Sequence, residues 1–143
     1  MEIFLGGRVL LEKLTPESDS SGRFQTQDDR GRVALFSPRQ PANHLEYVEF
    51  SERGVTRGFH YHEDLTEVIY TCWGNLTIAL RLVDEGEQVE LNLGQGDLLT
   101  IGPGIAHAVL AQETSTIIAT FSGTQSPLVD RVRYLDLSFS AEV

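Results

Sequence analysis

The sequence contains one cysteine, one lysine and no long hydrophobic run. A single cysteine, Cys72, excludes an internal disulfide framework and fits a reducing compartment. The longest apolar runs, "TIIATF" and "LLTI", are far too short to cross a bilayer. The N-terminus has an acidic residue at position 2 and no basic region before its apolar part, which argues against a signal peptide. We therefore expect a cytoplasmic protein without a membrane partner.

Basic residues are scarce, since 21 acidic residues face 11 basic ones and the net charge is −10. A surface of this charge repels phosphate backbones, so we predict no nucleic-acid partner. A single phosphorylated small molecule is still compatible, because a few arginines lining a pocket can outweigh the global charge locally. We expect a small-molecule substrate.

Helical periodicity is also nearly absent. One turn of helix is expected near the N-terminus, in "RVLLEKL", and "GRVALF" is predicted as a strand. From residue 45 onward, short runs rich in β-branched and aromatic residues alternate with turn residues. These predicted strands are 45–50, 55–59, 66–73, 76–83, 88–93, 97–101, 107–111, 115–121 and 131–137. No linker divides the 143 residues, so the sequence predicts a single all-β domain, 1–143, with a sandwich or small-barrel architecture.

Three of the four histidines form a pattern with one glutamate. His60 and His62 point to the same side of a strand, with Tyr61 on the other side. A reversal at 63–66 brings Glu67 back beside them, and a distant strand can add His107. Three nitrogens and one oxygen suit a divalent transition metal such as Zn, Fe, Mn, Ni or Co. The competing interpretation is an ordinary half-exposed strand, but the clustering favours a metal site with positions open to water or substrate.

These residues resemble the two motifs of the cupins. Gly54, five residues, "HYH", four residues, Glu67, six residues and Gly74 match the first motif. The second is approximate: Gly96 and "GPGIAH" keep register, while the family usually has proline where Gly102 stands and often asparagine where Ala111 stands. The resemblance covers 54–107. It implies a double-stranded β-helix, or jelly roll, and metal-ligand roles for His60, His62, Glu67 and His107.

Within the cupins, "RGFHYH" (57–62) is most similar to dTDP-sugar 3,4-ketoisomerases and 3,5-epimerases. Both groups usually work without a metal and lack a counterpart of Glu67. The epimerases' catalytic lysine has no counterpart either, since the only lysine is Lys13. The metal-binding cupin domain of some capsular-polysaccharide enzymes is also similar and does keep the His-x-His-x4-Glu spacing, so the sequence lies between these groups. Together these resemblances imply a metal-dependent isomerase or epimerase that acts beside the carbonyl of a 4-keto deoxysugar nucleotide, in secondary-metabolite or polysaccharide biosynthesis.

Such a reaction needs a group that removes a carbon-bound proton and a group that binds phosphate. The candidate catalytic residues are His60, His62, Tyr61, Arg57 and His44. With a metal bound, the base must be a group that does not bind the metal: His44, Glu49, Tyr47 or Tyr70. Without a metal, His60 or His62 is the base. Arg57 would bind a diphosphate, provided that Gly58 forms a bulge that turns it to the histidine side.

Two other classes of function stay open. One is a cupin metalloenzyme of another kind: an Fe(II) dioxygenase, or a cyclase or isomerase acting on an aromatic or polyketide-like substrate. The other is a non-catalytic cupin that binds a small ligand or a metal. The terminal "RVRYLDLSFSAEV" alternates like an edge strand, and such edges need covering, so we predict a homodimer.

Overall fold

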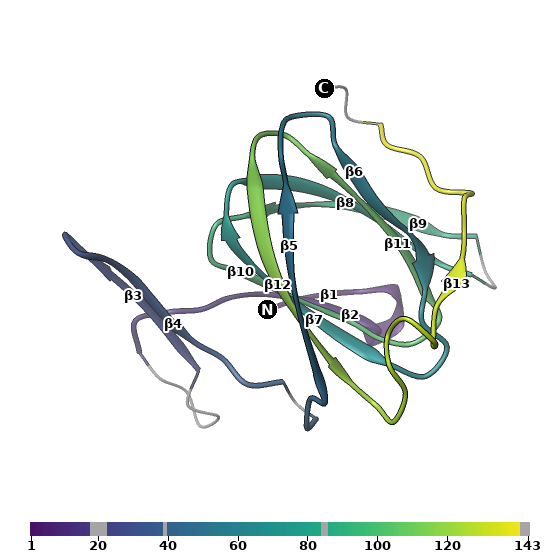
Figure 1. The fold of residues 1–143 in the computed structure, drawn as a ribbon, viewed down its shortest axis with the longest axis horizontal. Coiled ribbons are helices and arrows are strands. Elements are labelled where there is room, and N and C mark those ends of the chain that lie inside the picture. Colours follow the sequence, from purple (N-terminus) through teal and green to yellow (C-terminus); the bar gives the residue numbers. More distant parts are fainter. Residues whose placement is uncertain (18–22, 39, 84–85, 141–143) are drawn as a thin grey trace.

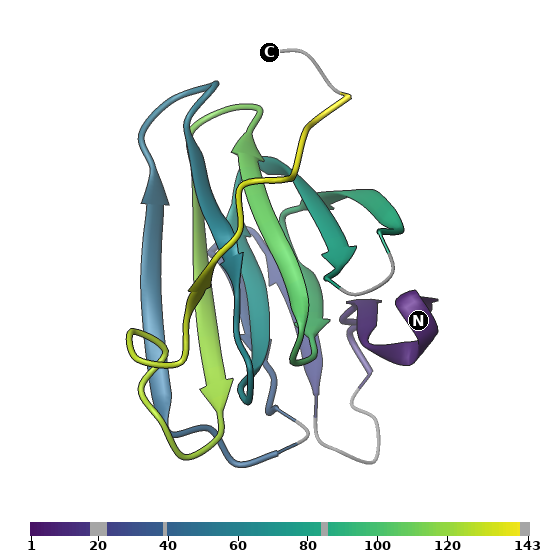
Figure 2. The ribbon, with the colours of Figure 1, turned by 90° about the vertical axis from the view of Figure 1, so that its right-hand side faces the viewer.

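A computed structural model describes residues 1–17, 23–38, 40–83 and 86–140 of the chain. Two sheets lie face to face (Figures 1 and 2). The larger has the order β1 (Glu2–Phe4), β2 (Val9–Lys13), β10 (Asp97–Ile101), β7 (Thr66–Trp73), β12 (Ser115–Ser122) and β5 (His44–Phe50). The smaller has the order β13 (Val132–Arg133), β6 (Thr56–Tyr61), β11 (Ile105–Ala111), β8 (Asn75–Leu82) and β9 (Gln88–Gly94). From β5 to β13 the chain alternates between the sheets except at the β8–β9 hairpin. This arrangement confirms the predicted all-β jelly roll.

The core lies between the inner faces of the two sheets. Along β7, Ile69 points into this core, whereas Val68 and Tyr70 point out of it. Fully buried Ile78 and Leu80 of β8 pack opposite from the smaller sheet. The period-2 alternation of the sequence is thus satisfied by burial on one face of each strand.

A hairpin of β3 (Phe24–Asp28) and β4 (Gly31–Leu35) forms a third layer over the outer face of the larger sheet (Figure 1). Phe36, just after β4, stacks on Tyr70 with ring centroids 5.2 Å apart. The Tyr70 hydroxyl donates a hydrogen bond to Gln25 at 2.7 Å. Because Tyr70 is held between sheet and hairpin, it lies outside the space between the two sheets.

The C-terminal segment, residues 134–140, crosses the outer face of the smaller sheet. Its Leu137 is buried against a bed of small side chains: Ala79, Ala106 and Ala108. Gln88 of β9 donates a hydrogen bond to the Ser138 carbonyl at 2.8 Å. The strand predicted at 131–137 is therefore wrong in extent: only Val132–Arg133 pair with β6, because the chain then leaves the sheet edge to cover apolar surface. Residues 141–143 lie outside the described part.

The predicted helical turn in "RVLLEKL" is also wrong. A short 3-10 turn lies earlier, at Leu5–Gly7, and the predicted segment instead forms β2. β2 pairs with β10, with Leu11 opposite Leu99, and Val9 is fully buried, so sheet pairing overrides the weak local helical preference. Over the described residues the structure has no helix long and apolar enough to span a bilayer.

Candidate functional site

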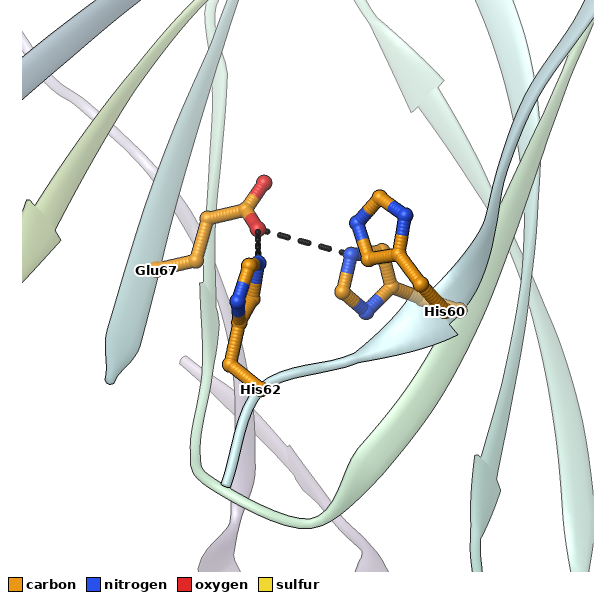
Figure 3. A group of neighbouring side chains, drawn as sticks. His60, His62 and Glu67 are labelled. Atoms are coloured by element: carbon orange, nitrogen blue, oxygen red, sulfur yellow. Dashed lines mark ion pairs between the residues drawn. The ribbon is translucent and has the colours of Figure 1, made fainter. Parts of the chain in front are cut away.

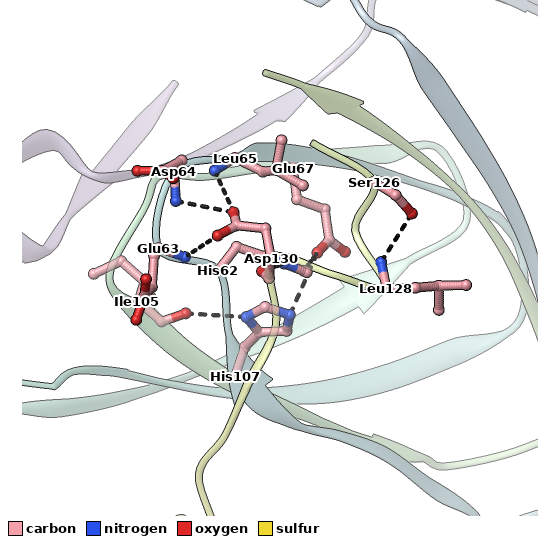
Figure 4. Close-up of polar contacts among 10 residues, drawn as sticks. All are labelled: His62, Glu63, Asp64, Leu65, Glu67, Ile105, His107, Ser126, Leu128 and Asp130. Atoms are coloured by element: carbon pink, nitrogen blue, oxygen red, sulfur yellow. Dashed lines mark hydrogen bonds and ion pairs between the residues drawn. The ribbon is translucent and has the colours of Figure 1, made fainter. Parts of the chain in front are cut away.

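Three strands bring His60, His62, Glu67 and His107 together (Figures 3 and 4). His60 lies near the end of β6, His62 follows that strand, Glu67 lies on β7 of the opposite sheet and His107 lies on β11. One ligand atom from each side chain lies within 4.8 Å of those of the other three. The four residues grouped from the sequence are therefore close together in the structure, although they come from two different sheets.

A bulge in β6 sets the direction of the neighbouring side chains. Opposite β11, His107 pairs with His60 but Ala108 pairs with Gly58, so Phe59 is an extra residue. Gly58 has a φ of 99°, and a β-carbon there would lie 2.8 Å from the His107 carbonyl oxygen. We predicted that Arg57 could face the histidines only if Gly58 formed a bulge. The bulge is present, and Arg57 lines the same cavity as the histidines.

Backbone carbonyls fix the orientation of two imidazoles (Figure 4). Nδ1 of His62 lies 2.6 Å from the Asp130 carbonyl oxygen, and Nδ1 of His107 lies 3.1 Å from that of Ile105. Each Nδ1 must carry a proton to donate to its carbonyl. In the neutral rings, Nε2 therefore presents a lone pair, and both Nε2 atoms face Glu67 Oε1, at 3.5 Å from His62 and 3.4 Å from His107.

This cluster fits a metal ion. Nε2 of His62 and Oε1 of Glu67 are buried and have no hydrogen-bond partner among the described residues. Lone pairs that face one another in a buried site need a cation or a proton between them. A tetrahedron with ligand bonds of about 2.1 Å has edges of about 3.4 Å, close to the two nitrogen–oxygen distances. The donor set and its spacing suit a divalent transition metal.

The electrostatics of the cluster favour the metal-binding form of two of its members, Glu67 and His60, but not of His107. Burial raises the pKa of the Glu67 carboxyl, but His107 and His62 outweigh it, and its pKa lies far below the ordinary value. Burial lowers the pKa of His107, but the Glu67 carboxylate outweighs it and the pKa lies above the ordinary value. Burial and the neighbouring His107 lower the pKa of His60 to about 4. Glu67 is thus ionised and His60 neutral near pH 7, the forms that bind a metal.

The cluster lies at the wall of a cavity of about 360 Å³, within the range of small-molecule sites. Two arginines line this cavity, Arg57 and Arg131. Arg57 donates a hydrogen bond to the Glu49 carbonyl at 3.1 Å, and its guanidinium lies 5.6 Å from the centre of the Phe50 ring. The cavity therefore combines a metal-type cluster with cationic side chains in a chain whose net charge is −10.

The other predicted catalytic residues lie in different places. Tyr61 points to the outer face of the smaller sheet, where its ring meets Tyr134 at 6.2 Å, so the structure does not place it in the cavity. His44 begins β5, is exposed and does not line the cavity. Among the alternative bases, Tyr47 and Glu49 line the cavity and Tyr70 does not.

Sequence reasoning missed three residues: Glu46, Asp130 and Arg131. Glu46 lines the cavity, and partial burial is the main cause that raises its pKa although much of the side chain is exposed. Val48 and Phe50 both pack in the core. Because side chains alternate along a strand, Glu46 lies on the same inner face of β5, and this alternation could have placed Glu46 there from the sequence. No local sequence pattern indicated Asp130 or Arg131. Asp130 lies 68 residues after His62 in the sequence, and only the fold brings these two residues to the site.

Solved structures with the same fold were found, while no family model and no curated protein sequence matches the chain. The sugar 3,4-ketoisomerase QdtA from Thermoanaerobacterium thermosaccharolyticum, in complex with TDP, is 20% identical with a TM-score of 0.71, over 90% of each chain. dTDP-4-dehydrorhamnose 3,5-epimerase from Sulfolobus tokodaii is 23% identical with a TM-score of 0.70, over 90% of this chain and 77% of that one. ChmJ, a 3'-monoepimerase from Streptomyces bikiniensis in complex with dTDP-quinovose, is 16% identical with a TM-score of 0.71, over 92% and 71%. These similarities show that the chain has the same fold as these sugar-nucleotide isomerases and epimerases.

Proposed function

We propose that this protein is an isomerase or epimerase that acts beside the ketone of a deoxysugar nucleotide and binds a divalent metal ion through His60, His62, Glu67 and His107. The observation that carries the proposal is the presence, in one cavity, of this convergent cluster and two arginines. The solved structures with the same fold support it, since two are described in complex with TDP or a dTDP-sugar.

The arginines suit the anionic end of such a substrate. Arg57 and Arg131 line the cavity, and a guanidinium pairs well with the oxygens of a diphosphate. Burial of the sugar against the apolar cavity residues Val109 and Ile117 would then bring its carbonyl toward the histidine cluster. A divalent ion held there would supply Lewis-acid polarisation of that carbonyl.

Glu46 is the candidate for the acid–base group. It stands on the inner face of β5, in register with Ala119 of β12, and does not belong to the metal cluster. The pKa of Glu46 is raised toward neutral pH, and a general base is more effective when its pKa lies near the working pH. In this role Glu46 removes the proton from the carbon beside the ketone, giving an enediolate. Return of that proton to the former carbonyl carbon, with loss of the proton from the neighbouring hydroxyl and protonation of the former ketone oxygen, gives the isomer. An epimer requires that a second group deliver a proton to the original carbon from the opposite face.

The first experiment measures metal content and nucleotide binding. Protein purified without added ions should contain a stoichiometric transition metal, and Glu67→Gln should lose it. Glu63→Gln, which changes a nearby exposed carboxylate, serves as the control. TDP should raise the melting temperature by mass action. Absence of any shift with TDP or TDP-sugars would contradict the proposed substrate class, and bound iron with consumption of O₂ would favour the dioxygenase instead.

The second experiment tests the reaction. In D₂O, incubation with TDP-4-keto-6-deoxyglucose should replace the proton on a carbon next to the ketone by deuterium, followed by NMR. Glu46→Gln should slow this exchange by about 10²- to 10⁴-fold, the usual contribution of a general base. Binding of TDP should stay within a few-fold of wild type. Unchanged exchange in the variant would remove Glu46 from the mechanism.

A further inference from the structure

Asp130 is a buried carboxylate on the segment between β12 and β13, and it is only 5% exposed. Its Oδ2 accepts hydrogen bonds from the backbone N–H groups of Asp64 and Leu65, both at 2.9 Å. Oδ1 accepts one from the N–H of Glu63 at 3.3 Å (Figure 4). One side chain thus satisfies three successive N–H groups of the turn that joins β6 to β7.

That turn separates two residues of the metal-type cluster, His62 and Glu67. The backbone carbonyl of Asp130 also accepts the hydrogen bond from His62 Nδ1, at 2.6 Å. Residue 130 therefore holds the connection between two proposed ligands through its side chain and sets the tautomer of one of them through its backbone. Groups that orient metal ligands in this way commonly change metal affinity when they are removed.

The same segment forms part of the cavity wall. Pro127, Leu128 and Arg131 all line the cavity. The Ser126 carbonyl accepts two local hydrogen bonds, from the N–H groups of Val129 at 2.9 Å and Asp130 at 3.0 Å, and these make the segment a compact turn. Because Arg131 directly follows Asp130, the anchor that orients His62 also fixes where this guanidinium enters the cavity.

We propose that Asp130 is a positioning residue that couples the metal cluster to the anion-binding wall of the cavity. Loss of its carboxylate releases the β6–β7 turn and the 126–131 segment together. His62 then loses a fixed partner for Nδ1, and Arg131 loses its fixed place. This inference rests on the proposed metal site and adds a residue that no motif of the sequence marks.

The test is a titration of the metal-stripped protein with Co²⁺, followed by its visible absorption well below the melting temperature. Asp130→Asn should weaken Co²⁺ binding by about 10- to 100-fold, because asparagine keeps one acceptor oxygen and turns an amide group toward N–H donors. The stabilisation of the chain by TDP should fall in the same variant. Asp136→Asn, an exposed carboxylate of the C-terminal segment that pairs with Arg81, is the matched control and should match wild type in both.

The outcomes separate positioning from a purely structural role. If Asp130→Asn lowers the melting temperature but leaves the Co²⁺ affinity of the folded protein unchanged, the proposal is wrong. If Co²⁺ binding weakens while the TDP effect is unchanged, the coupling to the cavity wall is wrong. A wild-type protein that binds Co²⁺ but not TDP would contradict the proposed substrate class, with positioning of the cluster still decided by the titration. A wild-type protein that binds no Co²⁺ would overturn both proposals.

Discussion

At residue 58 the chain adopts a backbone conformation that side chains other than glycine rarely take. The φ of 99° and the nearby His107 carbonyl oxygen leave no room for a β-carbon. Without the bulge, Arg57 would face away from the cavity and His60 would lose its register with His107. The shape of the site thus depends on one residue that contributes no functional group.

Gly58→Ala should therefore destabilise the protein by about 2 kcal/mol or more, from the unfavourable φ and the close contact together, and should weaken Co²⁺ binding. Urea unfolding and the metal titration measure the two effects. Gly6→Ala is the control, because Gly6 also has a positive φ, 66°, but a β-carbon there meets nothing within 4 Å. Equal losses in the two variants would show that φ alone matters and that the bulge is not specifically required.

The metal-free protein should lose stability on mild acidification because of His60. The pKa of His60 is about 4 in the folded chain, against an ordinary value of 6.5. Between these values the unfolded chain binds a proton that the folded chain does not, so the free energy of unfolding falls as pH decreases from 6.5 to 4. The raised pKa of His107 acts in the opposite direction, since its proton stabilises the folded state until pH rises through the folded value.

His60→Asn removes only the first effect, so the variant should gain stability relative to wild type on going from pH 7 to pH 5. Urea unfolding in the presence of EDTA at the two pH values gives the comparison. A stability difference that does not change with pH would mean that His60 is protonated as readily in the folded chain as in the unfolded one.

At the scale of the elements, the strands from residue 44 to 122 follow the predicted ranges closely. Alternating apolar positions and frequent turn residues determine them locally. Three N-terminal strands were missed: β1 is only three residues long, β2 was taken for a helical turn, and β3, "FQTQD", is polar because one of its faces is exposed. The four-residue cluster was predictable because its spacing lies within two motifs. Asp130 was not, because its role depends on packing between distant segments. Glu46 could have been placed on the inner face of β5 from the alternation with Val48 and Phe50, but that pattern does not mark it as a site residue.

The crossing of the C-terminal segment explains why Tyr61 lies outside the cavity. Tyr61 helps to form the apolar surface that Leu137 covers. Leu137→Ala should therefore cost about 2 kcal/mol of stability, at the lower end for a buried leucine because the side chain lies near the surface, while Co²⁺ affinity stays unchanged. Tyr61→Phe should change neither quantity. A large loss of deuterium exchange in Tyr61→Phe would return Tyr61 to the list of catalytic residues.

At the scale of the whole molecule, the homodimer is still a prediction, but its expected interface changes. The C-terminal strand is too short to carry it, whereas β5 is an edge strand of the larger sheet with exposed Leu45 and Tyr47. Exposed apolar side chains on a sheet edge favour association.

Sedimentation velocity should detect a dimer that dissociates in Leu45→Arg. Leu135→Arg is the control, since Leu135 is about as exposed, 62% against 68%, but lies on the C-terminal segment. A wild-type protein that sediments as a monomer at all concentrations would end the homodimer prediction, and a dimer that persists in Leu45→Arg would place the interface elsewhere.

The tie between Asp130 and His62 also has a consequence for synthesis on the ribosome. The chain emerges from its N-terminus, and the hydrogen-bond partner of His62 Nδ1 appears 68 residues after the histidine itself. A nascent chain that has emerged as far as His107 therefore still lacks the group that orients His62. At the proposed metal site, ordered metal loading would therefore have to wait until residue 130 has been translated.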